Sequence, residues 1–349
     1  MSKKCSNSIS KTEVGHESEA AKKSLKKGAV LAQIIGDSKA IHELRGQIER
    51  ISSCDATVLI TGESGTGKEL AARSIHYLGG RGGKPFISVN CSAIPEGLFE
   101  NEMFGHAKGA FTNAFFRQKG FVKEAEGGTL FLDEIGTISP FIQIKLLRLL
   151  ENREFKPLGD SNTQTADIRI IAATNRDLLS LIPEGAFRED LFYRLNIVPL
   201  YIPPLRGRKE DIPLLIEHFV RKYCKEYNRQ GKTLSKDLVE VLVSYEWRGN
   251  IRELENKIQQ LVVMTTTDVI TSENMQCSSI ELPYHKTGQS LKTEKKEAMN
   301  TFEKNYLMNL MSEHKGNVVI AAKNSGKSRT ALWNLLRKHQ LSPKQFHTR

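Results

Sequence analysis

A glycine-rich turn between an apolar run and an amphipathic segment is the feature that most constrains the fold of this chain. The turn reads GESGTGK over residues 62–68, follows the apolar residues 58–60, and precedes a segment with helical spacing of apolar residues from Glu69. This order is typical of a loop whose backbone N–H groups surround a β-phosphate. The N-terminus of the following helix adds partial positive charge, and Lys68 reaches the β- and γ-phosphate oxygens. The sequence therefore predicts a nucleoside triphosphate site. The alternative is a glycine-rich turn that is followed by a lysine by chance and binds no phosphate.

Two carboxylates are expected beside this loop. The apolar run 128–132 ends in Asp133 and Glu134. We expect Asp133 to hold Mg²⁺ through water and Glu134 to polarise the water that attacks the γ-phosphate. Glu69 stands where a Ser or Thr usually offers a hydroxyl to the metal, so the ion must depend more on phosphate, water and Asp133. The two motifs together predict a P-loop nucleoside triphosphatase, against the alternative of a solvated acidic turn.

Apolar runs alternate with helix-like segments or polar turns between residues 34 and 206. We expect buried strands over 57–60, 86–89, 129–132 and 168–172. This alternation favours a parallel sheet flanked by helices, which is an α/β architecture. Two prolines, Pro203 and Pro204, mark its end.

The rest of the chain is predicted to be helical in two parts. Within residues 207–278, apolar residues recur at three- and four-residue spacing over 213–227, 236–245 and 251–264. Asn250, with Glu253 three residues later, is expected to cap the last helix as an Asx variant of the capping box. Residues 279–296 have the Pro, Gly, Ser and Lys content of a linker. Residues 297–349 then form a small helical module.

Positive charge gathers at the two ends of the chain. The net charge is +11, yet residues 314–349 contain eight Lys or Arg and no Asp or Glu, and residues 1–30 contain seven Lys and three Glu. Concentrated positive charge suits a polyanion such as nucleic acid. Residues 1–30 are almost free of large apolar side chains, so we expect a disordered basic tail that extends to residue 33.

Composition excludes several classes of protein. The chain is 39% hydrophobic and 26% charged, as in globular domains. No apolar run approaches the roughly 18 residues of a membrane span, and the first residues lack the apolar core of a secretory signal. The five cysteines show no CxxC spacing, which argues against a disulfide framework or a cysteine-rich zinc site. We therefore expect a cytoplasmic protein of two or three domains.

Several motifs resemble those of the AAA+ activators of sigma-54 RNA polymerase, also called bacterial enhancer-binding proteins. They are GESGTGKE over 62–69, FISVNC over 86–91, ATN over 173–175, FREDLFYRL over 187–195 and WRGNIREL over 247–254. The resemblance runs from about residue 34 to the C-terminus, where the last residues are most similar to those of response-regulator activators. In this family the unusual Glu69 is the expected residue.

The resemblance implies roles for individual residues around the nucleotide. Asn90 would restrain the catalytic Glu134. Arg188 and Arg194 would act as fingers on the neighbouring subunit's nucleotide, where an arginine raises the rate by a factor on the order of 10³ or more; judged alone, they would be surface ion-pair residues. The expected nucleotide contacts are Ile35, Gly62, Glu63, Ser64, Gly65, Thr66, Gly67, Lys68, Glu69, the γ-phosphate sensor Asn175 and the lid sensor Arg252. The expected catalytic residues are Lys68, Asn90, Asp133, Glu134, Arg188 and Arg194.

The family's defining insert reads GAFTGA and contacts sigma-54. Here the loop consists of Gly109, Ala110, Phe111, Thr112, Asn113 and Ala114. Small residues allow a tight tip, and an exposed Phe111 offers an apolar contact, whereas burial of Phe111 in a core is the alternative. Asn113 replaces the second glycine. Because Asn tolerates a left-handed backbone better than most residues, we expect the turn to be kept, although the larger side chain could alter the fit to sigma-54.

The basic C-terminal module resembles a Fis-type helix-turn-helix domain. Helices are expected over 302–314, 318–323 and 329–339, with a Gly-containing turn at 325–327 and Ser328 as an N-cap. The third helix would present side chains suited to base edges and phosphates, namely Arg329, Thr330, Asn334, Arg337 and Lys338. The resemblance implies that this module dimerises on inverted repeats in double-stranded DNA, far upstream of the promoter. A basic helical hairpin for subunit contact is the alternative.

Together these patterns predict an AAA+ ATPase domain over 34–206, a helical lid over 207–278 and a helix-turn-helix domain over 297–349. Such a protein would bind upstream DNA, assemble into a ring that we expect to be a hexamer, and use ATP and Mg²⁺ to convert closed sigma-54 polymerase complexes into open ones. One alternative is a DNA-binding regulator that keeps the ATPase fold but no longer activates sigma-54 because of Asn113. A general AAA+ remodelling or loading enzyme is a second alternative.

The segment before the ATPase domain is short. Only 33 residues precede Ile34, whereas a receiver domain needs about 120. We therefore expect no receiver domain, and control by a regulatory protein acting in trans, by expression level or by the basic tail.

Overall fold

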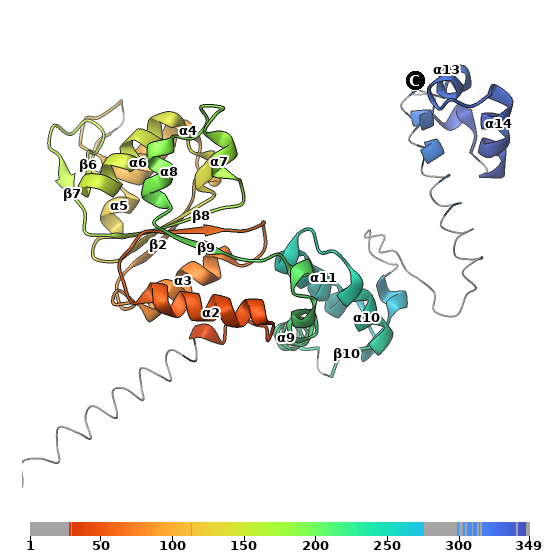
Figure 1. Ribbon diagram of the computed structural model, residues 1–349, viewed down its shortest axis with the longest axis horizontal. Coiled ribbons are helices and arrows are strands. Elements are labelled where there is room, and N and C mark those ends of the chain that lie inside the picture. Colours follow the sequence, from red (N-terminus) through yellow and green to blue (C-terminus); the bar gives the residue numbers. More distant parts are fainter. Residues whose placement is uncertain are drawn as a thin grey trace, which may run out of the picture. The chain divides into compact units, whose positions relative to one another are not determined.

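Figure 1 shows the computed structural model of the protein. It describes residues 28, 30–112, 114–229 and 231–275, and near the C-terminus residues 299, 303, 306–308, 310–312, 314, 316–339 and 341–346. The chain divides into two units, Met1–Ile280 and Glu281–Arg349, and each is described by itself. The predicted linker over 279–296 and nearly all of the predicted basic tail lie outside the described residues.

A five-stranded parallel sheet forms the centre of the first unit. Its strands are β1 (Val58–Thr61), β2 (Phe86–Asn90), β5 (Thr129–Asp133), β8 (Arg169–Thr174) and β9 (Val198–Tyr201). Their order in the sheet is β2-β5-β8-β1-β9, and every neighbouring pair is parallel. The four predicted strands and the α/β prediction are confirmed.

The strand β9 was not predicted from the sequence. It contains Pro199, and a proline inside an apolar run argues against a central strand. The sheet order places β9 at an edge, next to β1. A proline is tolerated there because one side of an edge strand needs no ladder hydrogen bonds.

Helices cover both faces of the sheet (Figure 1). The core on one face contains residues of α2 (Lys39–Ser52) and α3 (Lys68–Leu78), and the core on the other contains residues of α4 (Glu96–Phe104), α6 (Pro140–Asn152) and α8 (Glu189–Leu195). Alternate strand residues enter opposite cores, so Phe131 packs on the first side and Leu130 and Leu132 on the second. This double burial explains why the strands read as continuous apolar runs.

Short elements complete this domain. They are α5 (Phe121–Glu124), α7 (Leu178–Leu181), the pair β3 (Gly105–His106) and β4 (Gln118–Lys119), the pair β6 (Glu154–Phe155) and β7 (Gln164–Thr165), and the 3₁₀ helices Cys91–Ala93, Ile135–Thr137, Leu205–Gly207 and Lys209–Asp211.

A helical lid follows in the same unit. Its elements are α9 (Ile212–Glu226), α10 (Lys236–Ser244), α11 (Asn250–Met264), the short parallel pair β10 (Thr233–Leu234) and β11 (Val269–Ile270), and the 3₁₀ helix Ser272–Met275. The predicted helical lid is confirmed. The predicted cap of α11 is wrong in one respect, because its N-cap is Gly249 and the Asn250 side chain has other partners.

The second unit contains α13 (Val318–Asn324), α14 (Arg329–Lys338) and the 3₁₀ helix Pro343–Phe346. The described residues between 303 and 312 are helical as well. Ser328 caps α14 as predicted, since its Oγ accepts a hydrogen bond from the Ala331 N–H at 3.2 Å. A small core holds these helices together through Leu307, Leu310, Met311, Val318, Ala321, Ala322, Leu332 and Leu336.

Candidate nucleotide-binding site

The carboxyl ends of three neighbouring strands bring the predicted motifs to one edge of the sheet. β1 leads into loop 62–67, β5 ends at Asp133, and β8 ends directly before Asn175. β8 lies between β1 and β5 and pairs in parallel with both. Because ligands of open α/β sheets bind beyond the carboxyl ends of the strands, this edge is the expected position of a nucleotide.

The loop backbone has the conformation that its glycines allow. Gly65 and Gly67 have φ of 77° and 101°, a region that favours glycine. The helix α3 begins at Lys68, immediately after the loop. The loop therefore leads straight into a helix N-terminus, which is a ready anion site.

Lys68 is buried against the loop that precedes it. Its Nζ donates to the carbonyl oxygens of Gly62 at 2.9 Å and Glu63 at 3.2 Å. Burial lowers the pKa of Lys68, while the nearby Glu134 and Asp133 act in the opposite direction. The Lys68 ammonium therefore lies beside the loop and near enough to Glu134 and Asp133 to interact with their charges.

Asp133 and Glu134 form a tight turn at the end of β5. Asp133 Oδ1 accepts a hydrogen bond from the Glu134 N–H at 3.0 Å. Glu134 has φ of 54°, in the left-handed region, which costs a non-glycine residue about 1–2 kcal/mol. This backbone geometry starts the 3₁₀ helix Ile135–Thr137 and positions Glu134 at the strand end.

The donor set beside Lys68 fits Mg²⁺ held mainly by phosphate and water. Mg²⁺ in phosphate-binding sites usually takes one or two carboxylates and keeps several waters. Asp133 supplies a carboxylate at the right edge of the sheet. Within the described part of the chain no group of three or more His, Cys, Asp or Glu residues forms a metal cage. Asp133 would therefore hold the ion together with the phosphates.

Asn90, the last residue of β2, is the register partner of Asp133, the last residue of β5. Its Oδ1 accepts hydrogen bonds from Ser92 N at 3.0 Å and Ser92 Oγ at 2.7 Å. Among the described residues its hydrogen bonds do not include Glu134, so the expected restraint of Glu134 stays a prediction. The neighbouring Cys91 is buried, and burial together with Asp133 and Glu134 raises its pKa to about 12, which keeps the thiol protonated.

The two predicted arginine fingers lie on the surface in ion pairs. Arg188, the N-cap residue of α8, contacts Asp190 through two hydrogen bonds of 3.0 and 2.6 Å. Arg194 Nε lies 3.2 Å from Glu151 Oε1. Exposed ion pairs are weak in water, so these partners do not hold the two guanidinium groups firmly in place. Asn175, the predicted γ-phosphate sensor, is also exposed.

A cavity of about 240 Å³ adjoins the loop and contains the predicted contact Ile35 in its wall. Its apolar walls and few polar groups are typical of a small-ligand site and suit a nucleobase. The lining residues are Gln33, Ile34, Ile35, Leu44, Thr66, Gly67, Leu70, Ala71, Ile202, Arg208, Leu215, His218, Phe219, Ile251 and Glu255.

The lid helix α11 begins directly on the phosphate loop. The N–H groups of Ile251 and Arg252 donate to the Gly65 carbonyl oxygen at 3.0 and 3.4 Å. Arg252 Nη1 also donates to Ser64 Oγ at 3.3 Å. The predicted lid sensor is therefore next to the loop.

Asn250 has tertiary partners in place of a capping role. Its Oδ1 accepts from Leu205 N at 2.8 Å, and its Nδ2 donates to Ser64 O at 3.0 Å. Half of the predicted capping box exists, because Glu253 Oε2 accepts from Gly249 N at 2.8 Å. Asn250 is fully buried, and buried backbone groups that need partners use its amide in preference to a local cap.

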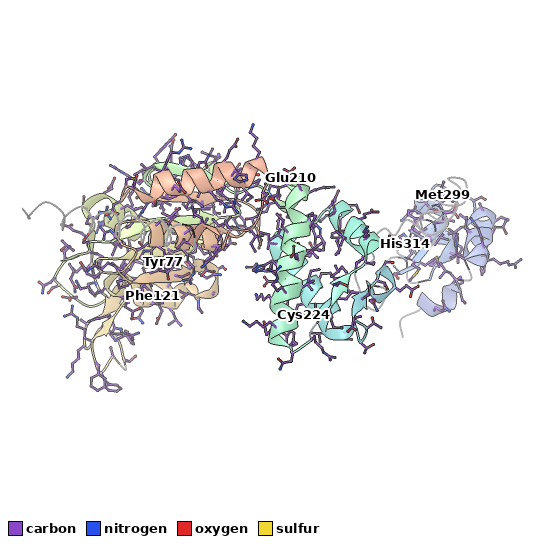
Figure 2. All side chains as sticks on the ribbon, turned by 90° about the horizontal axis from the view of Figure 1, so that it is seen from below. Tyr77, Phe121, Glu210, Cys224, Met299 and His314 are labelled. Atoms are coloured by element: carbon purple, nitrogen blue, oxygen red, sulfur yellow. The ribbon has the colours of Figure 1, made fainter. Side chains whose placement is uncertain are left out.

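Two arginines of the site were missed by the sequence analysis. Arg206 binds the carboxylate of Glu63, and the buried Arg208 donates to Thr66 O at 3.4 Å. Figure 2 labels Glu210, which follows them and lies where the sheet domain meets the lid. The only local signal was a pair of arginines after two prolines, and their partners lie about 140 residues earlier in the chain.

The loop that carries the predicted sigma-54 contact is closed at its base. Gly109 N donates to Ala114 O at 2.8 Å. Phe111 is 46% exposed and contacts His106 edge to face, with ring centroids 4.9 Å apart, so burial in a core is excluded. Asn113 lies outside the described residues. Two further aromatic residues, Phe115 and Phe116, are 67% and 82% exposed.

The predicted DNA-contacting side chains lie on the exposed face of α14. Arg329, Thr330, Asn334, Arg337 and Lys338 are all exposed. They are not equivalent, because Lys338 Nζ lies 2.6 Å from Glu303 Oε2.

No helix in the described ranges is long and apolar enough to cross a membrane.

Comparisons with known proteins agree with this geometry. The family model described as the sigma-54 interaction domain matches residues 34–201, and that of the AAA+ ATPase lid domain matches residues 206–290. The chain is 40% identical over 338 residues to nitrogen fixation protein AnfA of Azotobacter vinelandii, covering 97% of this chain and 63% of the relative. It is 44% identical over 313 residues to transcriptional regulatory protein GlrR of Escherichia coli (strain K12), covering 90% and 69%.

Solved structures give the same result. A crystal structure of NtrX from Brucella abortus matches with a TM-score of 0.67 and 33% identity, covering 94% of this chain and 74% of that chain. NtrX in complex with ADP and with ATP matches with TM-scores of 0.66 and 0.65. The chain spans 63% of the length of AnfA and 72% of that of regulatory protein AtoC of Escherichia coli (strain K12).

Proposed function

The chain belongs to the family of AAA+ ATPases that carry the sigma-54 interaction domain, and on that basis we propose that it is a sigma-54-dependent transcription activator driven by ATP hydrolysis. The protein binds ATP at loop 62–69, holds Mg²⁺ with the help of Asp133, and uses Glu134 to activate the attacking water. The energy of hydrolysis converts closed polymerase complexes into open ones.

The ATPase half of the proposal is supported by the position of Lys68. Its ammonium lies beside the loop and close enough to Asp133 and Glu134 to interact with both charges. A cation on the β- and γ-phosphates, a carboxylate for the metal and a carboxylate for water are the groups that phosphoryl transfer to water needs. The cavity of about 240 Å³ whose wall contains Ile35 supports this assignment, because its largely apolar lining suits a nucleobase.

The exposed loop 109–114 is the main support for the proposal that the protein acts on sigma-54 polymerase. A half-exposed phenylalanine on a short closed loop has no role in the core of its own domain, and large exposed apolar side chains mark binding surfaces. The loop lies within the segment matched by the sigma-54 interaction domain. We assign the sigma-54 contact to this loop.

Two further parts complete the proposal. Arg188 and Arg194 are exposed and can reach a neighbouring chain's nucleotide, which requires a ring of subunits, and we propose a hexamer. The exposed basic face of α14, in a C-terminal segment with eight Lys or Arg and no Asp or Glu, is proposed to bind double-stranded DNA upstream of the promoter as a Fis-type helix-turn-helix.

The test is open-complex formation by purified protein with sigma-54 polymerase on a promoter. Reactions with ATP are compared with a non-hydrolysable analogue, and an Asn113→Gly variant is run in parallel. Opening that requires hydrolysable ATP is expected. No opening by the native chain, with rescue by Asn113→Gly and with ATPase and DNA binding intact, would overturn activation in favour of a DNA-bound regulator that no longer acts on sigma-54.

A further inference from the structure

Four consecutive residues of the phosphate loop, 63–66, are each bound by the segment that leads into the lid or by the lid itself. Glu63 is bound by Arg206 and Asn250, and Ser64 by Asn250 and Arg252. The backbone of α11 binds the Gly65 carbonyl, and Arg208 binds the Thr66 carbonyl. Within the described part of the chain the N–H groups of residues 63–67 donate no hydrogen bond, whereas that of Gly62 donates to Thr174 O at 3.3 Å. The loop can therefore hold phosphate through these N–H groups and the lid through its carbonyl groups and side chains.

The Glu63 carboxylate is the charged centre of this contact. Arg206 donates two hydrogen bonds to this carboxylate, from Nη1 to Oε2 at 2.7 Å and from Nη2 to Oε1 at 2.5 Å. Asn250 Nδ2 donates a third, to Oε2 at 3.1 Å. The hydrogen bond from Arg206, and then that from Asn250, lowers the pKa of Glu63 to about 2. An ionised carboxylate in a phosphate loop would repel ATP, and the paired guanidinium offsets that repulsion.

The backbone leaves little freedom where α11 meets the loop. A Cβ on Gly65 would lie 2.3 Å from the Gly249 carbonyl oxygen, so glycine is required for this approach. Asn250 itself has φ of 55°, which allows its buried amide to span Leu205, Ser64 and Glu63. The positive end of α11 therefore lies on the loop beside that of α3, and both favour anionic phosphates.

We propose that Glu63 is a positioning residue that couples the phosphate loop to the lid through Arg206 and Asn250. The Glu63 carboxylate binds Arg206 and Asn250 at the lid and does not bind the nucleotide. The sequence motif instead suggests that Glu63 contacts the nucleotide. When phosphates rearrange the loop, residues 63–66 move α11 and the lid with them. The nucleotide Kd, KM and kcat readouts of this inference rest on the proposed function, whereas amide exchange in α11 of the nucleotide-free protein does not.

The direction in which Glu63→Gln changes the affinity for ATP distinguishes coupling to the lid from simple charge repulsion. Removing a negative charge near the phosphates would by itself tighten ATP binding. If Glu63 instead holds the lid on the loop, Glu63→Gln weakens ATP binding, because the neutral amide cannot pair with both nitrogens of Arg206. The two explanations therefore predict opposite changes.

The experiment uses the full chain with Glu63→Gln, Arg206→Gln and the double variant. Arg221→Gln is the matched control, since Arg221 forms an exposed pair with Glu217 at 2.6 Å within α9 and contacts no loop residue. The readouts are the Kd for a fluorescent ATP analogue, KM and kcat for ATP, and amide hydrogen exchange in residues 250–264.

Each single variant is expected to raise Kd and KM by roughly two- to tenfold, the range for loss of one hydrogen-bonded pair. Exchange at the start of α11 should rise, the double variant should be no worse than the singles, and the control should match the native chain. Tighter binding by Glu63→Gln, unchanged exchange at α11, or independent effects in the double variant would overturn the inference. Failure of the native chain to bind or hydrolyse ATP would count against the proposed function, while amide exchange of α11 in the nucleotide-free variants would still test the coupling.

Discussion

The side-chain oxygen of Gln143 accepts a hydrogen bond from the backbone N–H of Arg188 at 2.8 Å. Gln143 is fully buried on α6, and its Nε2 donates to Ile138 O at 3.0 Å and Ala186 O at 2.8 Å. One amide thus joins the turn that follows Glu134 to the segment that presents Arg188. In the proposed ring, the Gln143 side chain therefore connects two parts of one subunit. One is the turn after Glu134, which activates water in that subunit's own site, and the other is Arg188, which acts in the site of the next subunit.

Gln143→Leu is expected to lower kcat for ATP with little change in nucleotide Kd. The leucine leaves three backbone groups without their partner, and an unsatisfied buried group costs about 1–3 kcal/mol, so the free energy of unfolding should fall as well. Steady-state ATPase, nucleotide binding and chemical denaturation measure these effects. Gln259→Leu, which removes an exposed hydrogen bond to Tyr227, should leave all three unchanged. A Gln143→Leu variant that is destabilised but keeps native kcat at low temperature would show that the amide serves stability alone.

Mixing two inactive variants tests whether Arg188 acts in trans. Lys68→Ala removes the phosphate-binding ammonium, and Arg188→Ala removes the exposed finger, so each homogeneous ring should lose most of its ATPase activity. Mixed rings contain sites with Lys68 from one subunit and Arg188 from its neighbour, and these should recover part of the activity. Titration of one variant into the other measures the recovery. No recovery at any ratio, with normal assembly by size-exclusion chromatography, would contradict a role in trans.

Phe116→Ser is expected to weaken sigma-54 engagement without harming the fold. The side chain is 82% exposed beside loop 109–114, and such surface substitutions usually change stability by less than about 0.5 kcal/mol. Loss of an apolar contact should reduce sigma-54 binding and open-complex formation, while ATPase activity stays near native. Met264→Ser is the matched control, since Met264 is 67% exposed on the lid. Equal activation by native and Phe116→Ser protein would remove Phe116 from the contact.

Arg337 and Lys338 should differ in their effects on DNA binding. Arg337 is exposed, so Arg337→Ala should weaken binding to a selected DNA sequence by about 1–3 kcal/mol if it reads a base. Lys338→Ala should cost less, because Lys338 is held by Glu303.

Release of Lys338 from Glu303 gives the complementary test. Glu303→Gln frees Lys338 for a phosphate, which should tighten binding and steepen the log–log salt dependence by about 0.9 for one added phosphate contact. Fluorescence anisotropy over a salt series measures these changes. If Glu303→Gln has the same effect in a Lys338→Ala background, the ion pair does not control DNA binding.

Local patterns were sufficient for much of the fold. Apolar runs predicted four of the sheet strands to within two residues at each end, and helical spacing predicted α9, α10, α11 and α14. Ser328 was predicted as a cap because its partner, Ala331 N, is only three residues away. These elements can be predicted from the sequence because each depends on residues that are close together in the chain.

The sequence by itself determined the phosphate loop, the carboxylates after β5 and the alternation that builds a parallel sheet, because each depends on residue types at short spacing. Only the tertiary structure decided that Asn250 bridges to Ser64 instead of capping its helix, that Arg206 holds Glu63, and that Gln143 holds Arg188. These partners lie 45 to 186 residues apart. Asn250 and Gln143 are buried by folding, and a buried polar group must find a partner wherever the packed chain supplies one. Arg206 and Glu63 form a more exposed pair, which exists because folding brings two distant segments together.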